Sequence, residues 1–300
     1  MPSIDESSLE IHLREVIART LLQRAEVNGG FLRWSELTSV VLPDGSSRRV
    51  VDPGRGGIWN PSDLVATLSV VTSPDGPYAD RELDGGLLRY HYQSGPAGGK
   101  NLKLRRAMDL GLPVIRVQKV AANAYAPIYP VYVVDDDQVS REFTLSVDLS
   151  LRALPSMAVR SEIERRYAER LVMQRVHQPA FRARVMLAYE TRCTVCVLKR
   201  APLLDAAHII GDSDERGDAV VTNGLSLCKI HHAAYDQNLL GISPNYRVSI
   251  NEELLDEIDG PMLRHGLQEM HGRELWLPKS SRDQPDPDRL SVRFDQFLAS

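Results

Sequence analysis

The sequence predicts an α+β protein of two domains. Apolar residues recur at helical spacing near the N-terminus, and short β-branched runs separated by Gly- and Pro-rich turns follow them. The chain has three cysteines, and all of them fall in one short window of the second half. We expect a first domain with a curved, mostly antiparallel sheet, a helical linker and a metal-binding second domain, over residues 1–150, 151–178 and 179–300.

The elements of the first domain follow from spacing and turn residues. Leu9, Leu13, Val16 and Leu21 lie on one face of a helix over residues 6–27, which ends at a run of asparagine and glycine. A second helix is predicted between strands that are short and apolar. We predict that helix over 100–110, and strands over 64–72, 87–92, 114–120, 128–134 and 143–149.

The second half begins with two further predicted helices. Over 161–176 the apolar residues share one face and the arginines the other. Pro179 suits the first turn of the next helix, which runs to about Tyr189. A segment rich in cysteine and histidine then spans 191–250, with a short strand over 203–210.

Composition excludes several classes of protein. Apolar residues make up 43% of the chain, and no run reaches the roughly 20 apolar residues of a membrane helix. The N-terminal stretch is acidic and lacks the basic start and apolar core of a secretory signal. We therefore expect a cytoplasmic protein with no membrane partner.

The charge is unevenly distributed along the chain. The net charge is −4, yet residues 160–200 carry ten Arg and Lys against four Glu, and 100–119 carry six against one Asp. Such local basic surfaces can bind phosphates while the whole chain stays acidic, although solvated helix faces give the same pattern.

The three cysteines and one histidine have the spacing of a zinc site. Cys193 and Cys196 are separated by two residues, as are Cys228 and His231. Two such pairs about thirty residues apart are typical of a structural zinc site with four ligands, whereas an odd number of cysteines disfavours a disulfide framework. Zn²⁺ bound here would be structural, because four protein ligands leave no open position.

Between and after these pairs the chain reads AAHI, then NGLSLC, then HH followed by Tyr and Asp. These residues resemble the HNH (ββα-metal) endonuclease family over about residues 190–250. In that family two strands and a helix hold one divalent cation, usually Mg²⁺ or a similar ion. His208, Asn223 and His232 match its three motif positions in order.

The resemblance implies a role for each of these three residues. His208 would be the general base that deprotonates water for attack on a phosphodiester. Asn223 would orient the His208 ring by a hydrogen bond. His232 would be a ligand of the catalytic cation.

One position departs from the family pattern. Many members place Asp or His directly before the general base as a second metal ligand, and Ala207 stands there instead. Asp205 lies on the same strand face, and Asp236 lies one helical turn after His232. Either carboxylate could replace the missing ligand, and without one the domain would bind metal weakly or be inactive.

Residues of the first domain resemble a second family. Tyr78 and Tyr90 are twelve residues apart around a Gly-Gly turn, with Asp80 between them, and a glycine-rich stretch and a basic helix follow. This pattern is similar to the SRA (PUA-like) fold, which flips a modified cytosine out of duplex DNA. The two tyrosines would stack on the base and Asp80 would accept from its amino group. Phosphate contacts would come from Lys100, Lys103, Arg105 and Arg106.

Together the two resemblances imply a modification-dependent restriction endonuclease. It would cut double-stranded DNA that contains 5-methylcytosine or 5-hydroxymethylcytosine, and a homodimer would supply two active sites. The alternatives are an HNH enzyme with another trigger, such as phosphorothioate or unmodified DNA, and an inactive DNA-binding reader. An RNA-directed enzyme is disfavoured because no aromatic RNA-binding signature is present.

Overall fold

The chain divides between Ala180 and Phe181 into two units. The computed structural model describes residues 4–54, 56–73, 81–83, 87–93, 99–149, 176–212 and 214–300. The predicted boundary at residue 150 and the linker over 151–178 fall mainly outside these ranges, so they stay predictions. The predicted helix over 161–176 falls there as well, apart from its last residue.

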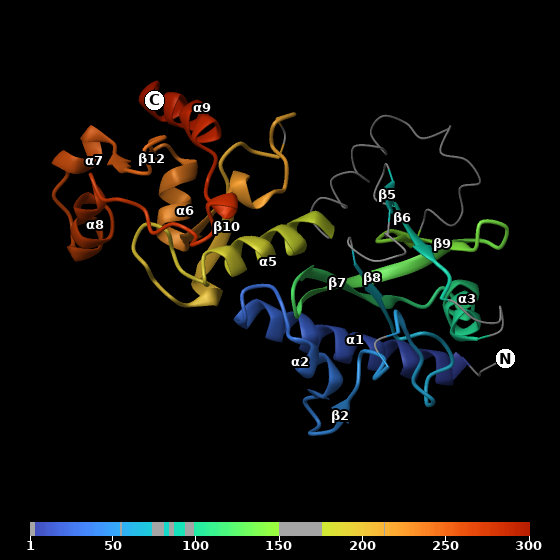
Figure 1. Cartoon of the computed structure of the whole chain (residues 1–300). Helices are drawn as coiled ribbons and strands as arrows, with labels where there is room; N and C mark the ends of the chain where they lie inside the picture. The colour runs from blue at the N-terminus through green and yellow to red at the C-terminus, as the bar shows by residue number, and fades with distance from the viewer. Residues whose placement is uncertain are drawn as a thin grey trace. The chain divides into compact units, whose positions relative to one another are not determined.

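A seven-stranded sheet forms the centre of the first unit (Figure 1). Its strand order is β3-β4-β7-β8-β9-β6-β5, and every neighbouring pair is antiparallel except β4 and β7, which are parallel. Register shifts in the β7–β8 and β8–β9 pairs mark irregularities of the kind that bend a sheet. The mostly antiparallel α+β fold is thus confirmed. The strands are β3 Ile58–Trp59, β4 Ser69–Thr72, β5 Arg81–Leu83, β6 Leu87–His91, β7 Val114–Ala121, β8 Ala124–Asp137 and β9 Glu142–Ser146.

Apolar cores lie on both faces of this sheet. Val114 packs in a core with Leu104 of α3 (Lys100–Leu110), whereas Ile115 and Val117 pack in another core with Leu21 of α1 (Ile4–Val27). Because successive side chains of a strand point to opposite faces, the two helices cover opposite faces of the sheet. Helix α2 (Trp34–Thr38) and the hairpin of β1 (Val40–Val41) and β2 (Ser47–Arg48) belong to the same unit.

The strand predicted over 64–72 is only partly correct. Residues 69–72 form β4, but the buried residues before it are not in a strand. The carbonyls of Ala66 and Thr67 accept hydrogen bonds from the buried guanidinium of Arg14, which also bonds Glu10. Leu64 and Leu68 are buried in the core that also contains Leu21 of α1, so an apolar pattern alone misidentified residues 64–68 as strand.

The second unit is built on an antiparallel pair of strands and a helix. Strand β10 (Leu204–His208) pairs with β11 (Gly224–Cys228), and α6 (Lys229–Asp236) follows and contacts both strands. This confirms the predicted order of two strands and a helix. The other elements are α5 Gln178–Ala188, which begins just before the division, β12 Leu240–Ile242, β13 Val248–Ile250, α7 Glu252–Asp256, α8 Pro261–Gly266, α9 Pro287–Leu298 and the short 3-10 turns η4 Ala201–Leu203, η5 Val221–Asn223, η6 Gln268–Met270 and η7 Ser281–Asp283.

The helices of the described residues are too short or too polar to cross a membrane, since none of them combines the length and the apolar character that a bilayer crossing requires.

Candidate active site and zinc site

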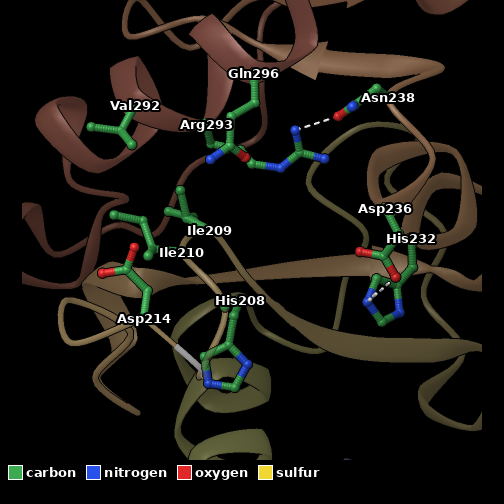
Figure 2. Close-up of a pocket in the computed structure, with 11 residues that line it drawn as sticks. His208, Ile209, Ile210, Asp214, His232, Asp236, Asn238, Val292, Arg293 and Gln296 are labelled. Carbon is green, nitrogen blue, oxygen red and sulfur yellow. Dashed lines mark hydrogen bonds and ion pairs between the residues drawn. The ribbon is translucent and has the colours of Figure 1, made fainter. Parts of the chain in front are cut away.

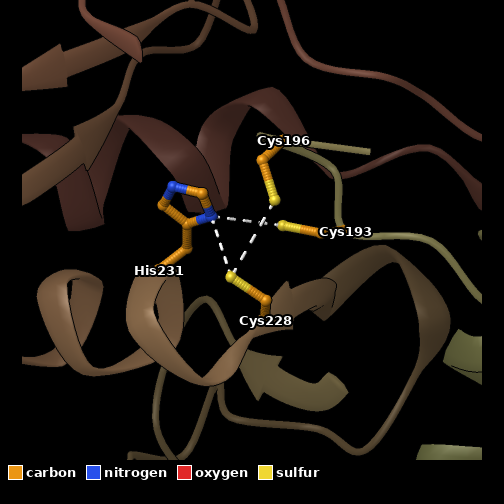
Figure 3. A group of neighbouring side chains, drawn as sticks. All are labelled: Cys193, Cys196, Cys228 and His231. Atoms are coloured by element: carbon orange, nitrogen blue, oxygen red, sulfur yellow. Dashed lines mark hydrogen bonds between the residues drawn. The ribbon is translucent and has the colours of Figure 1, made fainter. Parts of the chain in front are cut away.

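Four side chains meet at one end of α6 (Figure 3). Cys193 and Cys196 come from the loop after α5, Cys228 ends β11, and His231 lies in the first turn of α6. Their ligand atoms all lie within 4.8 Å of one another. None of the cysteines is in a disulfide. The structure therefore brings together the four residues that the spacing selected.

The separations within this cluster fit a tetrahedral zinc ion. His231 Nδ1 lies 3.1 Å from Cys228 Sγ and 3.4 Å from Cys193 Sγ, and the Cys196 and Cys228 sulfurs are 3.9 Å apart. Zinc bonds of about 2.3 Å to sulfur and about 2.0 Å to nitrogen place tetrahedral ligand atoms roughly 3.5 to 3.8 Å apart. The geometry of the cluster thus suits the donor set.

A hydrogen bond outside the cluster sets the tautomer of His231. Its Nε2 lies 2.8 Å from the carbonyl oxygen of Gly266, which can only accept, so Nε2 carries the proton. The lone pair of Nδ1 then faces the sulfurs, as a metal ligand requires. Hydrogen bonds with the sulfurs of Cys196 and Cys228 raise the pKa of Cys193, because they favour its protonated thiol.

His208 ends β10 and is held by α5, the helix that precedes the cysteine pair. Its ring stacks on Phe181 of α5, with centroids 4.1 Å apart and planes 15° apart. The close approach of α5 needs Gly224 opposite His208, because a Cβ there would lie 2.5 Å from Val185 and 3.0 Å from Phe181. Sequence reasoning missed Phe181, since its position in an amphipathic helix signals only a core residue.

The His208 ring has the protonation state that a general base needs. Burial lowers the pKa of His208, and the neighbouring His232 adds to this effect against the opposing charge of Asp212. Its Nε2 is buried and has no hydrogen-bond partner among the described residues. The ring lines a pocket, and a neutral imidazole there can accept a proton from a bound molecule.

The role predicted for Asn223 needs correction. Its side-chain oxygen accepts from the Ile210 N–H, and its amide donates to the carbonyls of Ile210 and Asp218, each at 3.0 Å. These bonds go to the main chain and not to the His208 ring. Asn223 is fully buried at the end of the β10–β11 pair, so it fixes the segment that follows His208 rather than the ring itself.

Two carboxylates flank His232, one at each ring nitrogen. Asp205 Oδ2 lies 3.2 Å from His232 Nδ1, and Asp236 Oδ2 lies 3.4 Å from His232 Nε2. Asp205 also accepts from Lys229 at 2.6 Å. Burial alone would raise the pKa of Asp205, but the hydrogen bonds from Lys229 and His232 outweigh it and lower that pKa. Asp205 is therefore an ionised partner that orients the His232 ring.

His208, His232 and Asp236 line one open pocket with a volume of about 570 Å³ (Figure 2). Asp205 is not among the lining residues of this pocket. The unit's last helix, α9, supplies another wall with Arg293 and Gln296. These α9 residues were not predicted, since nothing in the sequence near them resembles a motif.

Comparison with known protein families identifies the segment that supplies both histidines of this pocket. Residues 193–243 match the HNH endonuclease family. The protein therefore carries an HNH endonuclease domain over these residues, which include the Cys/His cluster and both pocket histidines. No curated protein matches the chain.

Solved structures give weaker likenesses. The modification-dependent TagI restriction endonuclease is 17% identical over 82% of this chain and 87% of that chain, with a TM-score of 0.30. The SUVH5 SRA domain in a complex with methylated CHH DNA is 19% identical over 32% and 75%, with a TM-score of 0.26. The type IV phosphorothioation-dependent restriction endonuclease ScoMcrA is 18% identical over 59% and 51%, with a TM-score of 0.24. These TM-scores are too low to transfer residues between the chains.

The predicted base pocket of the first unit is only partly described. Tyr78 and Asp80 lie outside the described residues. Tyr90 lies on β6 with 5% of its surface exposed, in the core that α3 covers. Its hydroxyl lies so close to Gly57 that a Cβ at that glycine would clash with it.

The basic residues predicted to contact phosphates are largely used within the first unit. Lys100 pairs with Asp52, and Arg105 pairs with Asp136. Lys103 donates to two main-chain carbonyls at 2.6 and 2.7 Å. These three basic side chains of α3 are therefore engaged in contacts within the unit.

Proposed function

We propose that the protein is a divalent-cation-dependent DNA endonuclease whose reaction takes place in the pocket of the HNH segment. One observation carries this proposal: His208 and His232, both inside the family match, line the same polar pocket. An arrangement of this kind suits hydrolysis of a phosphodiester, which needs a base for water and a positive centre for the phosphate.

His208 is the general base in this proposal. Its lowered pKa keeps the ring neutral near pH 7, and the stacking on Phe181 holds the ring in place. The ring also lines the pocket, where a bound water could reach it. Asn223 supports the base indirectly by holding the main chain of Ile210.

His232 and Asp236 are the proposed ligands of the cation. His232 Nε2 and the Asp236 carboxylate are 3.4 Å apart, close enough to share one ion with bonds of roughly 2.1 Å. Asp205 fixes the ring from its other side, as carboxylates commonly do for metal-binding histidines. When bound, such a cation supplies charge stabilisation for the phosphate and the leaving oxygen. Asp236 is thus favoured over Asp205 as the replacement for the position that Ala207 occupies.

The lowered pKa of His208 predicts how cleavage depends on pH. Because the neutral ring is the active form, the single-turnover rate should rise with pH and level off above a midpoint below 6.5, the ordinary value for histidine. Rates measured from about pH 5 to about pH 8 test this, with circular dichroism at each pH to show that the fold persists. A midpoint clearly above the ordinary value would contradict the proposed role.

The first unit is the proposed reader of the modified base. The proposal rests on the spacing of Tyr78, Asp80 and Tyr90, which resembles that of SRA domains, and on the mostly antiparallel sheet that carries Tyr90. The substrate would then be duplex DNA containing 5-methylcytosine or 5-hydroxymethylcytosine. A homodimer would provide two active sites for the two strands.

Digestion of matched plasmids tests the trigger. We expect cleavage of DNA methylated or hydroxymethylated at cytosine, in the presence of Mg²⁺, Mn²⁺ or Ni²⁺, at a rate at least about 100-fold above that of unmodified DNA, because a reader discriminates by a few kilocalories per mole. Phosphorothioate DNA is included as a third substrate. Equal cleavage of all substrates, or preference for phosphorothioate DNA, would overturn the cytosine reader but leave the nuclease.

A further inference from the structure

We propose that Arg293 of α9 binds a phosphate oxygen of the DNA in the nuclease pocket and is thus a catalytic residue supplied from outside the family match. This inference rests on the proposed function and assigns that function an additional residue. Arg293 lies fifty residues beyond the end of the match at residue 243. It belongs to the helix that supplies a wall of the pocket separate from the strand pair and α6.

The charge of the pocket supports this assignment. Among the lining residues that the structure describes, Arg293 is the one Lys or Arg, alongside the carboxylates of Asp214 and Asp236. Burial favours the neutral form of His208. Arg293 is therefore the permanently charged cationic side chain that a phosphodiester in this pocket could contact. Guanidinium groups suit phosphate oxygens because several N–H donors lie in one plane.

Contacts with α6 and the residues after it aim the Arg293 side chain. Its guanidinium lies over the ring of Tyr235, 4.6 Å from the centroid, and donates to the Tyr235 carbonyl and to Asn238 Oδ1. Tyr235 directly precedes Asp236, the proposed cation ligand. Figure 2 shows the Arg293 side chain extending across the pocket toward Asn238. Arg293 is thereby tied to the helix that carries His232 and Asp236.

These contacts leave donors for a ligand. A guanidinium has five N–H donors, and the two hydrogen bonds above use one on each terminal nitrogen. Arg293 is half-buried and lines the pocket, so the remaining donors lie where a phosphate oxygen could accept. Partial burial strengthens such a charge-assisted bond relative to one on the surface.

The helix that carries Arg293 is itself firmly placed. Phe297 packs so closely on Gly241 of β12 that a Cβ at Gly241 would clash with the ring. Leu290 is fully buried in the core that also contains Leu240 and Tyr235. Packing at both ends of the helix therefore fixes the position of Arg293 relative to α6.

Substitutions of Arg293 test the proposal by two independent readouts. Arg293→Gln is expected to lower the single-turnover cleavage rate about 100-fold, and Arg293→Lys less, because lysine keeps the charge but loses the planar donors. In a His208→Ala background, which should not cut, Arg293→Gln should also reduce the slope of log Kd against log salt by about one for a short duplex.

Two further variants separate a phosphate contact from a structural one. Arg247→Gln removes an exposed arginine that pairs with Glu274, and it should leave both the rate and the salt slope unchanged. Asn238→Ala removes a partner of Arg293 but keeps its charge, so it should leave the salt slope unchanged even if it destabilises the fold. Thermal unfolding of each variant reports the structural contribution.

The results distinguish failure of this inference from failure of the proposed function. If the parent protein cleaves DNA and Arg293→Gln matches it in rate and slope, Arg293 has no phosphate contact and only the inference falls. If Arg293→Gln loses activity only in proportion to its loss of folded protein, with an unchanged slope, the inference also falls. If His208→Ala cleaves like the parent, the proposed function itself is wrong.

Discussion

Replacing His208 with alanine should lower the rate of DNA cleavage by about 10³-fold, within the range that removal of a general base usually produces. The ring lines the pocket and has a lowered pKa. Stability should fall by only about 1 to 2 kcal/mol, because the substitution mainly removes the stacking of the ring on Phe181. Single-turnover cleavage and thermal unfolding measure the two effects separately.

The matched control for this substitution is His265→Ala. His265 is an exposed histidine of α8 that pairs with Glu269 and is not a lining residue of the pocket. Cleavage by this variant should equal that of the parent protein. Retention of cleavage by His208→Ala would remove His208 from the reaction and leave the HNH segment without its proposed base.

We propose that the Cys/His cluster holds a zinc ion, so replacing Cys228 with serine should abolish zinc binding and unfold much of the second unit. Cys228 joins β11 to α6, so its ligand bond would tie the strand pair and the helix to the loop that carries Cys193 and Cys196. Structural zinc sites contribute folding free energy directly. We expect a melting temperature lower by about 10 °C or more, together with loss of cleavage. Elemental analysis should find one zinc per chain in the parent protein and almost none in the variant.

An exposed residue near the cluster gives the control for this substitution. Lys199 lies three residues after Cys196 and is exposed, so Lys199→Ser should keep both the zinc and the melting temperature of the parent. The zinc site would be contradicted if the parent protein contained no zinc after purification and its melting temperature did not change when a chelator was added.

The Cys/His cluster could be predicted from the sequence because its arrangement is local. Two residues between the ligands of each pair determine how Cys193 and Cys196, or Cys228 and His231, meet at one ion. The relative positions of His208 and His232 were predictable for the same reason. A helix that directly follows a pair of strands leaves little freedom in where the two rings lie.

Contacts between distant parts of the chain were not predictable in this way. The carbonyls of Ala66 and Thr67 bond to Arg14, more than fifty residues earlier, and these bonds stand in place of the expected strand. Asn223 has the expected position but bonds the main chain, because a buried amide there meets the Ile210 peptide. Arg293 reaches the pocket from a helix whose sequence reads only as amphipathic.

Consecutive histidines on α6 face two different groups of side chains. His231 faces the sulfurs, while His232 faces Asp236 and the pocket. If each site takes an ion, the two sites would not be independent, because the sulfur-bound ion would hold the helical turn that also carries His232. Removing the metal from the Cys/His cluster should therefore also weaken cation binding in the pocket.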